Sequence, residues 1–120
     1  MAILAQLVDD VIVHKFELEG EALTIGRHPE NTITVDDAAV SARHAVIGFA
    51  PNAHFPQFYE YYLEDLKSTN GTFINDKRLQ SKQRLHNNDI VRVAYNRFKF
   101  MDDKEADLEK TVHMLQQSKF

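Results

Sequence analysis

Four polar side chains stand where short runs of strand-forming residues begin or end, and as a set they suit a phosphate group. Arg27 follows Gly26 at the end of one run, Ser41 precedes a second, and Thr69-Asn70 lies in a turn before a third. A phosphate on threonine carries nearly two negative charges and three acceptor oxygens, so its recognition needs a fixed cation and several neutral donors. Arginine stays charged and donates bidentately to phosphate, while hydroxyl and amide groups supply neutral donors.

Short runs of β-branched and aromatic residues, separated by turn formers, are the elements that would carry these side chains. The runs cover residues 3–8, 11–16, 22–25, 32–35, 43–49, 58–63, 72–74, 77–79, 90–93 and 97–100. Many short strands at regular spacing predict an all-β fold, a two-sheet antiparallel β-sandwich. We expect the loops that bear the polar side chains to gather at one end of it.

The pattern changes after Met101. Asp102 and Glu105 have the spacing of a capping box, which marks the start of a helix. Three apolar residues beyond them fall on one helical face, namely Leu108, Val112 and Leu115. The sequence therefore predicts a domain over residues 1–101 and a tail over 102–120 that contains a short C-terminal α-helix.

Four separated motifs, in order along the chain, resemble the signature of the forkhead-associated (FHA) domain family. They are Gly26-Arg27, Ser41-Ala42-Arg43-His44, Thr69-Asn70-Gly71-Thr72 at the end of residues 63–72, and the Leu-x-x-x-Asp-Ile segment of residues 85–90. The resemblance extends from about residue 22 to about residue 100. Each motif alone is weak, but together, and all at strand ends, they are specific.

The resemblance implies a phosphothreonine-dependent protein–protein interaction module in Ser/Thr kinase signalling or assembly. By resemblance, Arg27, Ser41 and Thr69 contact the phosphate, and Asn70 holds the peptide backbone beside it. His44 is expected to brace the loop. Gly71 permits a positive φ in the turn. The expected partners are a phosphothreonine-containing protein and a Ser/Thr kinase or its substrates, with no cofactor.

The chain departs from the family pattern in two ways, and the first departure keeps an alternative open. Ala42 stands where the family often has a polar or basic residue, so one charge-assisted contact of about 1.5–3 kcal/mol is missing. Arg43 is a candidate to replace it, although neighbours on a strand point to opposite faces, so an outward position is equally open. Asn88 and Ala94 stand where the family often has glycine, and Ala94 is expected to keep a negative φ. The alternative is a phosphorylation-independent FHA scaffold or oligomerisation module with a degenerate phosphate site.

Other functional classes have little support in the sequence. Ser41, His44 and Asp65 could suggest a hydrolase, but no nucleophile elbow surrounds the serine, so we expect no enzyme. The chain has no cysteine, and its six histidines are scattered without ligand spacing, so we expect no metal site. A net charge of -4 argues weakly against nucleic acid as a partner.

The remaining expectations concern location and assembly. No apolar run is long enough to cross a membrane, and the lack of cysteine favours a cytoplasmic location. A homo-oligomer could form through the tail or through an aromatic face. The aromatic residues in question are Phe55, Phe58, Tyr59, Tyr61 and Tyr62. Thr111, flanked by acidic residues, is a speculative kinase target in the tail.

Overall fold

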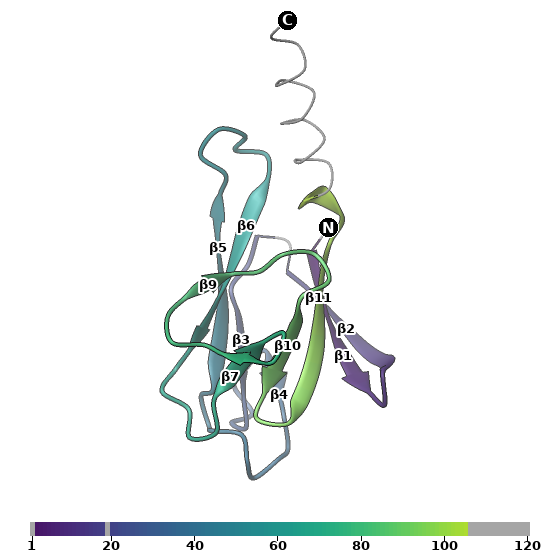
Figure 1. Ribbon diagram of the computed structural model, residues 1–120, viewed down its shortest axis with the longest axis vertical. Helices are drawn as coiled ribbons and strands as arrows, with labels where there is room; N and C mark the ends of the chain where they lie inside the picture. Colours follow the sequence, from purple (N-terminus) through teal and green to yellow (C-terminus); the bar gives the residue numbers. More distant parts are fainter. Residues whose placement is uncertain (1, 19, 106–120) are drawn as a thin grey trace, which may run out of the picture.

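Two β-sheets pack against one another in the computed structural model, which describes residues 2–18 and 20–105 (Figure 1). The strands are β1 (Ala2–Val8), β2 (Val11–Glu17), β3 (Leu23–Gly26), β4 (Ile33–Thr34), β5 (Ala45–Pro51), β6 (Tyr59–Asp65), β7 (Thr72–Ile74), β8 (Lys77–Arg78), β9 (Gln83–Arg84), β10 (Ile90–Val93) and β11 (Asn96–Asp102). One sheet has the order β2-β1-β11-β10-β7-β8 and the other the order β4-β3-β5-β6-β9. The predicted all-β sandwich is confirmed.

Strand pairing departs from a purely antiparallel pattern at one place. β3 and β4 run parallel, with Ile25 opposite Ile33, whereas the other strand pairs that the structure describes are antiparallel. The short strand β9 was not expected from the sequence. Its two residues are polar and show no alternation, and it forms because it lies beside β6.

The inward faces of the two sheets fill one core. Phe98 and Phe100 alternate with exposed or half-buried neighbours on β11, and both are fully buried, as is Leu63 on β6. The ring of Tyr61 lies 5.7 Å from the ring of Phe100, which joins the two sheets. Burying one such side chain stabilises the fold by about 1.5–3 kcal/mol, so this core fixes the strand positions.

Tight turns set the register of two hairpins. Asp9 and Asp10 join β1 to β2 with φ values of 51° and 63°, and Asn75 and Asp76 join β7 to β8 with 49° and 68°. Left-handed residues at both central positions give a turn whose twist matches that of the strands. Aspartate and asparagine tolerate this conformation better than other non-glycine residues, so these sequences suit the turns.

The expectation that Ala94 keeps a negative φ was wrong. Its φ is 53°, in the left-handed region, and the residue is almost completely buried in the turn between β10 and β11. Its N–H donates to the Gly71 carbonyl at 3.2 Å, which fixes the alanine in this conformation. Asn88 is the other residue that stands where the family often has glycine, and its φ is 74°, which asparagine tolerates.

The aromatic cluster divides between the core and the surface. Tyr61 is buried, and Tyr62 donates to a Glu60 carboxylate oxygen at 2.6 Å on the outer side of β6. Tyr59 and Phe49 pack edge to face at 5.4 Å and stay partly exposed. Contacts within the domain therefore account for Tyr61 and Tyr62. The homo-oligomer stays a prediction.

A helical turn over residues 103–105 follows β11, as expected. Asp102 accepts a hydrogen bond from the Lys104 N–H at 3.1 Å, so it caps this turn. In a capping box the Glu105 carboxylate would accept from the Asp102 N–H, and this part of the prediction was wrong. The Glu105 carboxylate instead binds the His86 ring at 2.7 Å and the Asn87 N–H. The apolar tail residues and Thr111 lie outside the described residues. In the part of the chain that the structure describes, no helix has the length and apolarity of a membrane span.

Candidate functional site

Three loops meet at the end of the sandwich away from the β5–β6 hairpin (Figure 1). We name them the arginine loop (residues 27–32, after β3), the serine loop (residues 35–44, before β5) and the threonine loop (residues 66–71, after β6). They carry Arg27, Ser41 and Thr69-Asn70. The core residues of β3, β5 and β6 hold the loop ends, so the sandwich determines how near these side chains come.

Hydrogen bonds to Ser41 connect the three loops. Its carbonyl accepts from the Arg27 N–H at 3.0 Å, and its side-chain oxygen accepts from the Thr69 N–H at 3.1 Å. A serine hydroxyl has one donor hydrogen besides its acceptor lone pairs. Because Thr69 occupies an acceptor position, the hydroxyl hydrogen of Ser41 remains available for a ligand.

His44 links the serine loop to the threonine loop from below. The side chain is fully buried, its Nδ1 accepts from the Ser41 N–H at 3.1 Å, and Nε2 lies 2.7 Å from the Gly71 carbonyl oxygen. Since a backbone N–H can only donate, Nδ1 must be the acceptor, and Nε2 carries the proton that is donated to Gly71. The His44 ring reaches the Ser41 backbone because the chain bends at residues 42–43, before β5 begins.

Gly26 allows the arginine loop and the serine loop to approach each other. A Cβ atom at this position would lie 2.2 Å from the Ala42 carbonyl oxygen and 2.7 Å from Asn31 Nδ2. The same carbonyl accepts hydrogen bonds from the His28 N–H at 3.1 Å and from Asn31 Nδ2 at 2.8 Å. Only a residue without a side chain fits here, which explains the glycine before Arg27.

Asn70 is held by the serine loop. Its Nδ2 donates to the Ala39 carbonyl at 2.7 Å, which leaves its Oδ1 and second amide hydrogen for a ligand. Asp37 anchors the same loop, because it accepts from the Ala39 N–H at 2.9 Å and from Asn96 Nδ2 at 3.0 Å. These hydrogen bonds hold the pKa of Asp37 below its ordinary value. Sequence reasoning missed Asp37 and Asn96, since they are 59 residues apart.

Asp65 fixes the shape of the threonine loop. Its carboxylate accepts from the Ser68 N–H at 3.1 Å and from the Thr72 hydroxyl at 2.7 Å. Partial burial acts to raise the pKa of Asp65, but the hydrogen bonds from Ser68 and Thr72 outweigh it, so this pKa lies below its usual value. The Asp-x-x-Ser spacing is a local turn signal that could have identified this role.

Arg43 belongs to the serine loop, but its side chain does not take part in the hydrogen bonds that link the three loops. Its side chain is exposed and lines a small hollow with residues of β3, of the arginine loop and of the threonine loop, among them Thr24, His28 and Leu66. Among the described residues it has no hydrogen bond to Ser41, Thr69 or Asn70. Its contact with a ligand stays a prediction. The Ala42 side chain is exposed at the same bend and offers no donor.

The arrangement does not form a hydrolytic triad. His44 Nδ1 binds the backbone N–H of Ser41, not its hydroxyl, and Nε2 is engaged by Gly71. The Asp65 carboxylate binds Ser68 and Thr72. No cluster of three or more His, Asp or Glu side chains suited to a metal ion occurs in residues 2–18 and 20–105.

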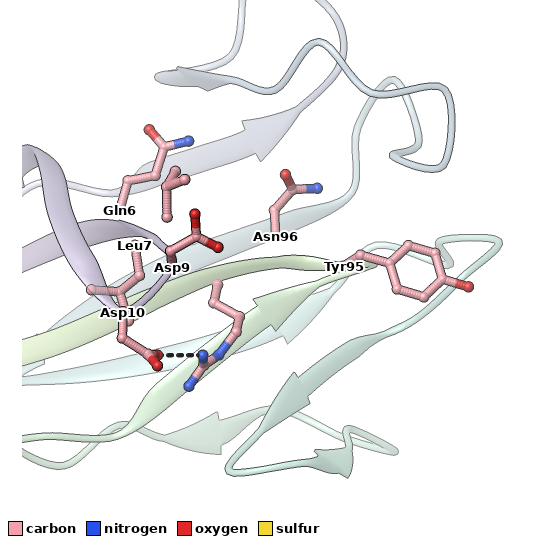
Figure 2. A pocket seen from close by; sticks show the side chains of 8 residues that line it. Gln6, Leu7, Asp9, Asp10, Tyr95 and Asn96 are labelled. Carbon is pink, nitrogen blue, oxygen red and sulfur yellow. Dashed lines mark hydrogen bonds and ion pairs between the residues drawn. The ribbon is translucent and has the colours of Figure 1, made fainter.

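A larger hollow lies at the β1–β2 and β10–β11 turns, with a volume of about 430 Å³ (Figure 2). Arg97 and Asp10 form an ion pair of 2.7 Å beside it, and Figure 2 shows Tyr95 projecting away from it. Its polar groups are the side chains of exposed turns, and it holds none of the predicted site residues. We therefore take the three linked loops as the functional site.

Known proteins are similar to this chain in sequence and in structure. A sequence model of the FHA domain matches residues 23–94. The oxoglutarate dehydrogenase inhibitor of Corynebacterium jeikeium is 36% identical over 93 residues, which are 77% of this chain and 59% of that protein. The glycogen accumulation regulator GarA of Mycobacterium tuberculosis is 33% identical over 87 residues, covering 72% of this chain and 49% of the regulator.

A solved structure of Mycobacterium tuberculosis EmbR in complex with a low-affinity phosphopeptide has a TM-score of 0.68 and 30% identity, and covers 83% of this chain and 24% of that chain. The chain thus spans less than two thirds of the length of these relatives. The family match covers more than half of the chain and includes the three loops. This chain belongs to the FHA domain family.

Proposed function

We propose that the chain binds phosphothreonine in a partner protein, reversibly and without catalysis, in Ser/Thr kinase signalling or assembly. The convergence of three loops on Ser41 carries the proposal. Arg27 and Thr69 each donate a backbone N–H to this residue, so their side chains start within one small area. Such an area offers one permanent cation and two hydroxyl donors, which match the charge and the acceptors of a phosphate.

The state of the Arg27 side chain supports the same function. It is exposed, and within the described residues no carboxylate lies within ion-pair distance of its guanidinium group. An unpaired arginine beside two hydroxyl donors is ready to receive a dianion without breaking an existing ion pair. EmbR, a relative with 30% identity, was solved with a phosphopeptide. A cytoplasmic location, and a Ser/Thr kinase or its substrates as partners, stay predictions.

Fluorescence anisotropy with degenerate peptide libraries tests the proposal. Libraries centred on phosphothreonine, phosphoserine and unphosphorylated threonine are titrated with the protein, with Arg27→Ala and with Lys15→Ala. Lys15 lies on the exposed strand β2 and gives the same charge change away from the three loops. We expect phosphothreonine binding that weakens with salt, is abolished by Arg27→Ala and survives Lys15→Ala.

The outcome also separates this function from the phosphorylation-independent scaffold. If unphosphorylated and phosphorylated libraries bind equally, or if Arg27→Ala binds like the parent protein, the phosphothreonine proposal is wrong. The scaffold alternative rests on Ala42 alone, because its methyl group cannot contact phosphate as a donor. The linked loops give this alternative no further support.

A further inference from the structure

Arg78 lies against the threonine loop, although it comes from a different element of the sheet. It is the second residue of β8 and stands opposite Phe73 of β7. A Cβ atom on Gly71 would lie 2.8 Å from Arg78 Nε and 3.0 Å from its Cζ. The guanidinium group therefore packs on the backbone immediately after Asn70, at the edge of the proposed phosphate site.

This arginine also lacks the partners that other arginines of the chain have. Arg84, Arg92 and Arg97 each have a carboxylate oxygen within 4.0 Å. Arg78 is exposed, and the described residues place no carboxylate and no hydrogen-bond acceptor on its side chain. Arg92 stacks on Phe73 with its Cζ 3.7 Å from the ring centroid, so the neighbouring cation is already engaged. Arg78 is thus an uncompensated donor group beside the site.

We propose that Arg78 binds an acidic side chain close to the phosphothreonine, so that the site selects acid-flanked phosphothreonine peptides. The inference rests on the proposed function. If Asn70 holds the peptide backbone, an extended peptide advances about 3.3 Å per residue, so a residue one to three positions from the phosphothreonine passes beside Gly71. A guanidinium group pairs bidentately with a carboxylate, which suits aspartate or glutamate at such a position.

The test uses phosphothreonine peptides in which aspartate is placed at each of three positions on either side, and matched peptides with asparagine. The protein, Arg78→Gln and Lys77→Gln are titrated with each peptide by fluorescence anisotropy. Lys77 is the matched control, because it is exposed and precedes Arg78 on the same hairpin, and successive strand residues point to opposite faces. We expect about a fivefold preference for aspartate at one or two positions, lost in Arg78→Gln and kept in Lys77→Gln.

Three results would overturn the inference, and each has a different meaning. Equal weakening of the aspartate and asparagine peptides by Arg78→Gln would show that the arginine acts on the phosphate. Equal binding of the two peptides by the unaltered protein would remove the acidic preference and leave phosphothreonine recognition standing. Binding that ignores the phosphate, with Arg27→Ala behaving like the parent protein, would remove the proposed function and this inference with it.

Discussion

Replacing His44 with phenylalanine removes the side chain that connects the serine loop to the threonine loop. Both side chains are planar rings on one methylene group, although the phenylalanine ring is somewhat larger, and both hydrogen bonds of the histidine are lost. The Ser41 N–H loses its 3.1 Å acceptor, and the Gly71 carbonyl loses its 2.7 Å donor. The backbone bonds of residue 44, to Ile25 and Leu66, do not involve the ring and persist.

The structure sets the size of the effect. A buried polar group without a partner costs about 1–3 kcal/mol. The Ser41 N–H has no second acceptor among the described residues, whereas the Gly71 carbonyl still accepts from the Ala94 N–H at 3.2 Å. The first group should therefore incur the full penalty and the second only part of it. We expect the free energy of unfolding to fall by about 2–4 kcal/mol in His44→Phe.

Urea denaturation followed by far-ultraviolet circular dichroism measures this change, and anisotropy with a phosphothreonine peptide measures the consequence for binding. The peptide affinity should fall at a temperature where the variant is still folded, because Ser41 and Thr69 are no longer held together. His44→Gln is the control, since its amide nitrogen can still donate to Gly71, and its loss of stability should be smaller. Surface substitutions usually change the free energy of unfolding by less than about 0.5 kcal/mol. If His44→Phe changes it by no more than this, the bracing role is refuted.

Three other variants test separate parts of the structure. Ala94→Gly should raise the free energy of unfolding by about 1 kcal/mol, because it relieves the left-handed strain at φ 53°, and an unchanged urea midpoint would contradict this. Asp65→Asn should lower stability at pH 7, because it weakens the hydrogen bonds from Ser68. Folding lowers the pKa of Asp65, so the contribution of this carboxylate to stability is present above the unfolded pKa and is lost as the pH falls through the folded pKa. The difference in the free energy of unfolding between parent and variant should therefore shrink from pH 7 to pH 3. A constant difference would exclude a charge effect. Gly26→Ala places a Cβ 2.2 Å from the Ala42 carbonyl oxygen, so the arginine loop and the serine loop must separate. We expect loss of phosphothreonine-peptide binding and, in a thermal scan, a lower melting temperature. Unchanged binding would show that the close approach is not needed.

Local patterns in the sequence were enough to predict most strands and the gathering of the three loops at one end of the sandwich. The runs at residues 97–100 and 90–93 predicted strands that the structure contains, and the aspartate and asparagine residues at 9–10 and 75–76 suit the left-handed turns found there. These signals are local, because side-chain alternation and left-handed turn residues act within a few positions. Strand β9 was missed because it forms only through its partner β6.

Contacts between distant residues could not be predicted in the same way. Glu105 has the sequence position of a capping residue, yet it binds the His86 ring, because the fold brings a carboxylate and a ring 19 positions apart within 2.7 Å. The position of Ala94 likewise depends on a partner, since its N–H donates to the carbonyl of Gly71 on another strand connection. In both cases a long-range hydrogen bond outweighs a local preference.

The sequence by itself determined the chemistry available at the site, because it places an arginine and neutral donors at strand ends, a set of groups that suits an anion with several acceptors. It also indicated an all-β fold, because many short segments of strand-forming residues at regular spacing are typical of one. Only the tertiary structure decided that Ser41 accepts from the threonine loop, that Arg43 lines a hollow with His28 and Leu66, and that Arg78 comes to Gly71. The reason is physical: sheet packing sets how separate strands approach each other, and a pattern within one strand carries no information about that distance.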